Sequence, residues 1–279
     1  PSVALGDVDG DGDLDLVAGN YQAVNRLYLN DGSGGFSSMG MAVGSEVGPT
    51  LVVALGDVDH DGDLDLVVGG AGPGTFDGSV GIYRNDGSGG FPLSGTTLSD
   101  PSSSFAGGLV LTDIDADGDL DILTTRNTGQ GISQVRLLRN DGSGGYPSTG
   151  LVVATSGLGA TGLEVGDLDG DGDFDLALLV DYPRPLINQA RAGFSGSGHD
   201  IGTATDPTIA TALGDLDGDG LLDVVAGDAN GAIGSYLNDG DGRFPDVGTA
   251  VGVGDSGQVF SLALGDLDLQ GPRPVRAGQ

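Results

Sequence analysis

The chain carries five copies of a short acidic loop whose Asp spacing could bind a metal ion. The first copy, GDVDGDGDLD at residues 6–15, has an Asp at every second position from Asp7 to Asp15. Two unit charges about 4 Å apart at an effective dielectric constant of about 20 repel each other by about 4 kcal/mol. Because the stretch contains no basic residue, the repulsion must be relieved from outside it, and a bound cation would do so.

The loop follows the frame D-x-D-x-D-G-x-x-D, numbered here from position one to position nine. Carboxylates at alternate positions of a tight loop can converge on one centre, and the Gly at position six gives the backbone the freedom to turn sharply. The carbonyl at position seven can point inward, and the last Asp can bind with both oxygens. In the first copy, these ligands are Asp7, Asp9, Asp11, the carbonyl of Asp13, and Asp15.

An all-oxygen cage with four carboxylates suits a hard cation that takes six to eight ligands, which favours Ca²⁺ over Mg²⁺. Zn²⁺ prefers His or Cys ligands, which the ligating positions lack. An EF-hand needs Glu at position twelve and flanking helices. Position twelve is Ala18, Val68, Thr124, Leu178 or Ala226. The repeat period excludes glycine-rich RTX repeats, and the absence of Cys excludes Cys-linked calcium repeats.

A solvated Asx-turn is the alternative interpretation, because Asp and Gly favour turns in any protein. Five complete copies that all keep Asp at position nine argue against it. Position eight is always a large apolar residue, which we expect to pack in the core of its own repeat: Leu14, Leu64, Leu120, Phe174 and Leu222.

The elements around the loop repeat every 50 residues or so. The first Asp of each copy falls at 7, 57, 113, 167, 215 and 266. Each unit reads as an alternating strand, the acidic loop, a Val/Leu/Ile-rich strand such as LDLVAG, a third strand, a turn and a weaker fourth strand. The turn begins with Asn-Asp-Gly in every complete unit except the fourth, which has NQARAGF at 188–194. This pattern predicts an all-β protein, a β-propeller of four-stranded antiparallel blades with the acidic loops between first and second strands. A solenoid is the competing architecture. The predicted units are 1–50, 51–106, 107–160, 161–208, 209–259 and a partial sixth at 260–279.

Composition excludes several classes of protein. The net charge of −31 over 279 residues argues against a nucleic-acid binder. Without Cys, the chain is neither a disulfide scaffold nor a thiol enzyme. No apolar run reaches the length of a membrane span. The chain begins with Pro rather than Met, so we expect it to start inside a longer precursor.

The units resemble the FG-GAP/VCBS repeats of integrin α-subunit heads and many secreted bacterial proteins, and are similar to the blades of calcium-binding propeller lectins. The resemblance covers nearly the whole chain and implies that every complete copy binds Ca²⁺, giving about five sites. No calcium is expected in the sixth copy, which keeps Asp266 and Asp268 but has Gln270 and Pro274 at positions five and nine. The implied ligands of the second to fifth copies, with position seven acting through its carbonyl, are Asp57, Asp59, Asp61, Asp63 and Asp65; Asp113, Asp115, Asp117, Asp119 and Asp121; Asp167, Asp169, Asp171, Asp173 and Asp175; and Asp215, Asp217, Asp219, Leu221 and Asp223.

The proteins resembled have seven blades, whereas this chain has five units and the start of a sixth. We therefore expect a fragment of a larger propeller, with a smaller closed ring as the alternative. The acidic loops and the Asn-Asp-Gly turns should share one edge of the fold, and the variable connectors the other. Uniform loops indicate stabilisation and variable loops recognition.

These patterns predict an extracellular or cell-surface binding or adhesion module with structural Ca²⁺ and a protein or glycan ligand on the variable edge. Loops without the EF-hand Glu are expected to work at the near-millimolar calcium found outside cells. Candidate ligand contacts are Tyr21, Phe76, Arg126, Tyr182 and Arg184. A lectin remains an alternative, as does part of a secreted polysaccharide-degrading enzyme by analogy of fold. No catalytic residue is predicted, since neither His60 nor His199 has a partnered nucleophile and no G-x-S-x-G motif follows a strand.

Overall fold

A computed structural model describes residues 2–45, 48–70, 79–99, 104–128, 132–156, 162–179, 183–189, 194–196, 201, 208–245, 247–251 and 258–265. The chain divides into two compact units, Pro1–Gly159 and Ala160–Gln279. The described residues form strands, turns and bends without any helix. Accordingly, no helix in these ranges is long and apolar enough to cross a membrane.

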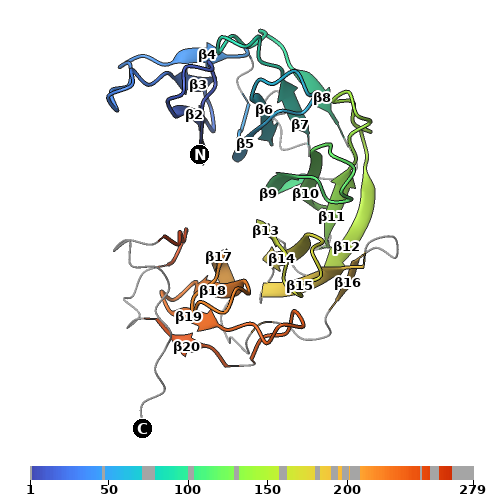
Figure 1. Cartoon of the computed structure of the whole chain (residues 1–279). Helices are drawn as coiled ribbons and strands as arrows, with labels where there is room; N and C mark the ends of the chain where they lie inside the picture. The colour runs from blue at the N-terminus through green and yellow to red at the C-terminus, as the bar shows by residue number, and fades with distance from the viewer. Residues whose placement is uncertain are drawn as a thin grey trace. The chain divides into compact units, whose positions relative to one another are not determined.

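Five four-stranded antiparallel sheets follow one another along the chain, one for each acidic loop (Figure 1). In each sheet the strands lie in sequence order. The first unit holds the sheets β1–β4 (Ser2–Gly6, Asp15–Gly19, Asn25–Tyr28, Met41–Val43), β5–β8 (Val52–Gly56, Asp65–Gly69, Val80–Tyr83, Thr96–Leu98) and β9–β12 (Ser104–Thr112, Asp121–Asn127, Ser133–Leu138, Leu151–Ser156). The second unit holds β13–β16 (Gly162–Gly166, Asp175–Leu179, Pro183–Asn188, Phe194–Gly196) and β17–β20 (Thr208–Gly214, Asp223–Asp228, Ile233–Tyr236, Thr249–Ala250). The predicted all-β class and the four-stranded antiparallel repeat are confirmed.

The acidic loop is the hairpin connection between the first and second strands. In the first sheet, the ladder ends at the pair Gly6↔Asp15, so the loop begins and ends at two residues that face each other. The position-six glycines have φ between 92° and 97°, a backbone conformation that a residue with a Cβ rarely adopts. Gly at this position therefore lets the loop close over so short a span.

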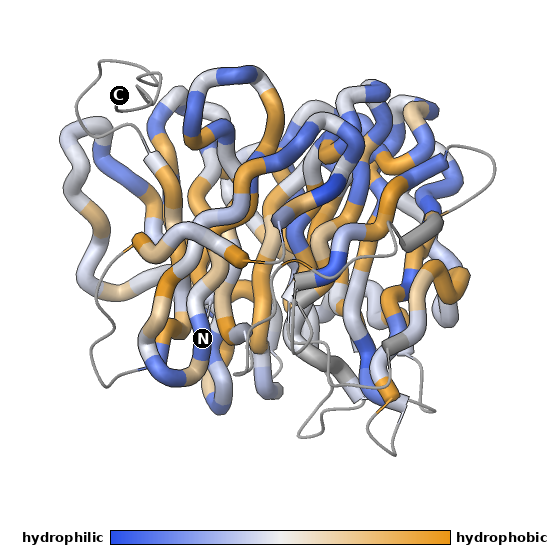
Figure 2. Tube along the Cα trace, turned by 90° about the horizontal axis from the view of Figure 1, so that it is seen from below, coloured by the Kyte–Doolittle hydropathy of each residue, from blue (hydrophilic) through white to orange (hydrophobic). Residues whose placement is uncertain are grey.

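Hydrophobic side chains pack between consecutive sheets of a unit rather than inside single sheets. One cluster joins Val8, Val17 and Leu27 of the first repeat to Val53 and Leu66 of the second. Further clusters join the second sheet to the third and, in the other unit, the fourth to the fifth. Figure 2 shows the hydrophobic colour along the strands and the hydrophilic colour in the loops at their ends. Each repeat thus buries its apolar face against a neighbour, as stacked repeats do.

The Asn at the end of the third strand hydrogen-bonds to the preceding repeat. Asn85 donates from Nδ2 to the carbonyl of Val8 at 2.7 Å. The same bond joins Asn140 to Val58 at 2.8 Å and Asn238 to Leu168 at 2.7 Å. In each pair the acceptor is the buried residue at position two of the preceding acidic loop, so these bonds tie neighbouring repeats together at their acidic loops.

Position eight contacts the preceding repeat in three of the five repeats, and Leu222 also packs against the hydrophobic core, as predicted for this position. Leu64 lies against Gly6, where a Cβ would be only 2.7 Å from its Cδ1. Leu120 lies in the same way against Gly56, and Leu222 against Gly166. In the first repeat, Leu14 is 57% exposed. The apolar residue at position eight is therefore an inter-repeat contact.

The antiparallel order places the acidic loop and the connection from the third to the fourth strand at the same end of each sheet, as predicted. The connection from the second to the third strand, such as residues 20–24 in the first repeat, lies at the opposite end. Residues 258–265, which include the predicted boundary between the fifth and sixth units, contact the fifth sheet through Val259 on Gly227 and Leu264 on Gly214. The predicted repeat boundaries remain predictions.

The bond between repeats predicts that equivalent Asn residues differ in their contribution to stability. Asn85→Ala removes the donors to Val8 and Leu64, whereas Asn30→Ala removes a donor to Leu14 of its own repeat only. Because the carbonyl of Val8 would be left buried without a partner, we expect Asn85→Ala to lower the free energy of unfolding by about 1–3 kcal/mol more than Asn30→Ala. Urea denaturation of both variants measures the difference, and equal losses would contradict the bond's role.

Candidate metal centres

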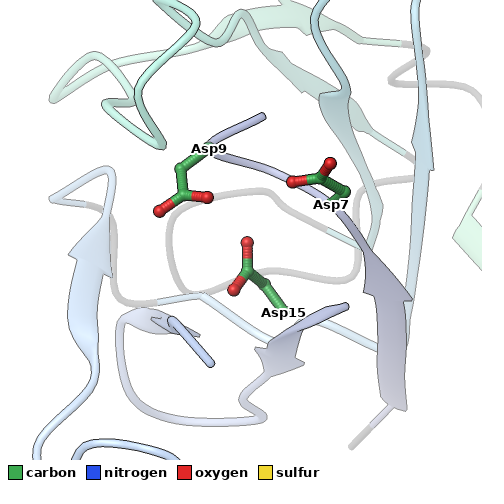
Figure 3. Close-up of side chains that lie close together, drawn as sticks. All are labelled: Asp7, Asp9 and Asp15. Carbon is green, nitrogen blue, oxygen red and sulfur yellow. The ribbon is translucent and has the colours of Figure 1, made fainter. Parts of the chain in front are cut away.

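Three carboxylates converge in the first acidic loop. Asp7 and Asp9 lie in the loop and Asp15 begins β2, and each offers an oxygen within 4.8 Å of the other two. Figure 3 shows their carboxylates facing one another. Four other groups of three Asp meet the same limit, one in each of the other repeats: Asp57, Asp59 and Asp61; Asp113, Asp115 and Asp117; Asp167, Asp169 and Asp175; Asp215, Asp217 and Asp223. Five Asp triads could therefore hold metal ions, which agrees with the number predicted.

The triads use positions one, three and nine in repeats one, four and five, and positions one, three and five in repeats two and three. Positions one and three are thus common to all five. Position seven contributes no carboxylate to any triad in the described residues. Its role as a carbonyl ligand, including that of Leu221, remains a prediction.

Hydrogen bonds within each loop hold the carboxylates in place. The Asp at position one accepts from the amide of the position-six Gly, as Asp7 does from Gly12 at 3.0 Å. The Asp at position five accepts from the amide of position seven, as Asp11 does from Asp13 at 3.0 Å. The same two bonds recur in all five loops at 2.9–3.1 Å. The loop is thus a series of Asx-type turns whose geometry brings the triad together.

The Asp at position nine is buried in every repeat, with 0–1% of its surface exposed. Oδ1 of Asp15 accepts from the amide of Asn30 at 2.8 Å, and Oδ2 accepts from the amide of Val8 at 2.9 Å. The carboxylate therefore joins the acidic loop to the end of the third strand. Equivalent bonds to the third strand have lengths of 2.6–2.8 Å in the other four repeats.

Several carboxylate oxygens of the triads are buried without a hydrogen-bond partner: Oδ1 of Asp7, Asp57 and Asp59. An unsatisfied buried oxygen carries a desolvation cost, which a coordinated cation would remove. The all-oxygen donor set and these oxygens fit a hard cation such as Ca²⁺.

Burial and neighbouring charge also act on the proton affinity of these groups. Burial, followed by the nearby Asp carboxylates, raises the pKa of Asp121 to about 6, and Asp175 is raised to about 6 in the same way. Burial and the charges of Asp11 and Asp15 raise the pKa of Asp9. These directions are those expected for carboxylates that are crowded together in the absence of a cation.

Sequence reasoning missed the residues that surround the triads. The sequence pattern predicts only a turn at the Asn that ends the third strand, although the recurrence of this Asn at the same place indicates a structural role. Arg84 and Arg139, one residue earlier, form ion pairs with Asp59 and Asp115. His60 lies 2.5 Å from Asp119 of the next repeat and has φ 61°, at the position where repeats one, four and five have Gly.

The candidate ligand contacts differ in their exposure to solvent. Tyr21 is 44% exposed in the connection between β2 and β3, and Arg184 is half-buried in β15. Arg126 is fully buried in β10, so it does not fit a ligand contact on an exposed edge of the sheet. Phe76, Tyr182, His199, Asp266 and Asp268 lie outside the described residues.

Repeated four-stranded antiparallel sheets, each with an acidic loop between its first two strands, define an all-β protein of propeller-like blades. The family model of the FG-GAP-like repeat matches residues 7–68, 113–178 and 188–271 of this chain. The chain belongs to the FG-GAP-like repeat family. A comparison with curated protein sequences finds no significant match.

Solved structures with a similar fold have low sequence identity. The BP39L lectin from Burkholderia pseudomallei matches with a TM-score of 0.63 and 15% identity, over 90% of this chain and 70% of the lectin. The Vibrio cholerae biofilm matrix protein Bap1 matches with a TM-score of 0.52 and 18% identity, over 87% of this chain and 38% of its own. BBS1N, solved in complex with ARL6DN, matches with a TM-score of 0.54 and 12% identity, over 87% and 66%. This chain therefore spans less than two thirds of Bap1 and of BBS1N.

The contacts of position nine predict that two Asp residues of one loop contribute differently to the stability of the metal-free protein. Asp65→Asn replaces an acceptor of two backbone amides by a group with a single acceptor oxygen. We expect a loss of about 1–3 kcal/mol in the free energy of unfolding in the presence of chelator. The exposed Asp61→Asn keeps its acceptor for the amide of Asp63, so its stability should stay unchanged or rise. If Asp61→Asn were the more damaging variant, the structural role of position nine would be wrong.

The raised pKa values of Asp121 and Asp175 predict how the metal-free protein depends on pH. Between the ordinary value of 3.8 and the folded value of about 6, the folded state binds more protons than the unfolded state. Its stability should therefore fall as the pH rises through this window. Thermal melts with chelator in about 1 M NaCl, where the Debye length is about 3 Å, separate this effect from general repulsion. A flat profile would contradict it.

Proposed function

We propose that the chain is an extracellular, calcium-dependent binding module in which structural Ca²⁺ stabilises the acidic loops and the opposite edge of the sheets recognises a ligand. The observation that carries the proposal is the set of five Asp triads at the same place in five sheets. A lone triad is a common surface feature, but the same triad in every complete repeat indicates a shared ligand.

In each loop, the Asp residues at positions one, three, five and nine would hold the ion, together with the carbonyl at position seven. Bound Ca²⁺ would supply positive charge at the point where the carboxylates crowd together. It would also join the loop to β2, because position nine begins the second strand and accepts from the third. Ions of this kind are held at near-millimolar calcium in extracellular modules, which supports a location outside the cell.

The variable connections lie at the end of the sheets away from the triads, where Tyr21 is exposed. The similar structures include a lectin, a biofilm matrix protein and a component of a protein complex. These relatives favour a non-catalytic binding role with a protein or glycan ligand. The alternative of a catalytic part in polysaccharide degradation has no specific observation in its favour.

One feature supports the lectin alternative. A pocket of about 180 Å³ lies on the fifth sheet towards the end opposite its acidic loop. Thr208, Asp228 and Tyr236 line it together with Ile233 and several glycine and alanine residues. An aromatic ring beside hydroxyl and carboxylate groups, with small residues around it, suits a sugar ring. Loss of glycan binding on Tyr236→Ala, with an unchanged melting midpoint, would support this candidate.

The metal assignment is tested by a thermal melt of the chelated protein titrated with Ca²⁺ and, separately, with Mg²⁺. A site filled at about 100 times its dissociation constant adds about 2.7 kcal/mol, so several sites should raise the midpoint strongly with Ca²⁺ and far less with Mg²⁺. Asp7→Asn should remove part of this rise. Asp13→Asn, which removes a charge outside the triad and keeps the backbone carbonyl, serves as its matched control.

A midpoint that does not respond to Ca²⁺ would overturn the metal assignment and leave the loops as solvated turns. Equal responses to Ca²⁺ and Mg²⁺ would overturn the choice of Ca²⁺. Equal losses in Asp7→Asn and Asp13→Asn would show that charge alone, and not the triad, determines the response.

A further inference from the structure

The five candidate metal centres differ in the residue that comes just before the Asn at the end of the third strand. This residue is Leu29, Arg84, Arg139, Ile187 or Leu237 in repeats one to five. Two repeats therefore place a positive charge beside the acidic loop, and three place an aliphatic side chain there.

Arg84 connects its own acidic loop to the next repeat. Its Nη1 donates to Oδ2 of Asp59, the position-three member of the second triad. Its Nη2 donates to the carbonyl of Gly144 at 2.8 Å and to that of Ser143 at 3.4 Å, both in the third repeat. The other oxygen of Asp59 is buried without a partner, so Arg84 neutralises one side of this carboxylate and leaves the other free.

The third repeat has the same arrangement, in which Nη1 of Arg139 donates to Oδ2 of Asp115 at position three. These are also the two repeats whose triads consist of positions one, three and five. In both, the guanidinium group holds the position-three carboxylate from outside the triad.

The aliphatic residues occupy the same place without the charge. Leu29 contacts Gly89 of the second repeat, and Ile187 contacts Gly242 of the fifth, as Arg84 contacts Gly144. The position-three residues of these repeats are Asp9 and Asp169, and the residue before the Asn supplies neither of them with a positive charge.

We propose that Arg84 and Arg139 are built-in counter-cations that divide the five metal centres into two classes. Repeats one, four and five form strong sites that need a cation, and repeats two and three form weaker sites whose loops stay ordered without one. The inference rests on the proposed function, because it concerns the affinity of the same five sites. A guanidinium group and a divalent cation on one carboxylate repel each other, and the guanidinium also uses lone pairs that the cation would take.

The test compares Arg84→Leu with Leu29→Arg in the full chain, since each substitution copies the residue found in the other class of repeat. Calcium titration calorimetry of the unchanged chain should show two phases, three strong sites and two weak ones. Arg84→Leu should move one site from the weak to the strong phase, with affinity rising about tenfold or more. Leu29→Arg should move one site in the opposite direction by a similar factor.

A second measurement reports on the metal-free state. With chelator present, Arg84→Leu should lower the melting midpoint, because Asp59 loses its counter-charge and Gly144 loses a donor. Saturating Ca²⁺ should restore most of the loss. Arg139→Leu repeats the comparison in the third repeat if Arg84→Leu folds poorly.

The outcomes separate this inference from the proposed function. A chain that binds no Ca²⁺ overturns the proposed function and the inference together. Equal affinity at all sites, or substitutions that change none of them, overturns the inference and leaves calcium binding in place. A weaker second site in Arg84→Leu would also overturn it, since it would show that Arg84 positions Asp59 as a ligand instead of competing with the cation.

Discussion

A buried carboxylate at the start of the second strand holds every repeat together. The Asp at position nine has almost no exposed surface, yet it accepts hydrogen bonds from the acidic loop and from the end of the third strand. A buried charge is tolerated only where it is paired or hydrogen-bonded. Here two backbone amides satisfy it, and the neighbouring carboxylates of the loop add repulsion that these amides do not cancel. Other contacts of the loop offset this local excess of negative charge.

The repeats offer several means of compensation. Amides within the loop bind the Asp side chains at positions one and five. In repeats two and three, the Arg that follows the third strand pairs with position three, and His60 contacts Asp119 across the boundary between those repeats. Buried oxygens such as Oδ1 of Asp7 still lack a partner, and a bound cation would have the charge and the size to satisfy them.

The same loops carry the contacts between repeats. The residue at position two is buried in the core and receives the Asn of the following repeat, and the Leu at position eight lies on a glycine of the preceding one. A metal centre at this place would therefore stabilise a repeat and both of its neighbours within a unit. These contacts between repeats fit the small variation of the acidic loop, compared with the variable connections at the other end of the sheets.

The sequence by itself determined the repeat, the strand order and the position of the acidic loops, because alternation, turn residues and period are local properties of the chain. It also named every member of the five triads, since alternate carboxylates in a tight loop converge wherever the loop is placed. The tertiary structure decided which neighbour each repeat contacts. Leu64 contacts Gly6 of the preceding repeat, and Arg84 donates to the carbonyl of Gly144 in the next repeat. Arg126 is buried in its sheet. These contacts depend on how one sheet stacks on the next. They join residues about 50 positions apart, so the local pattern of the sequence cannot predict them.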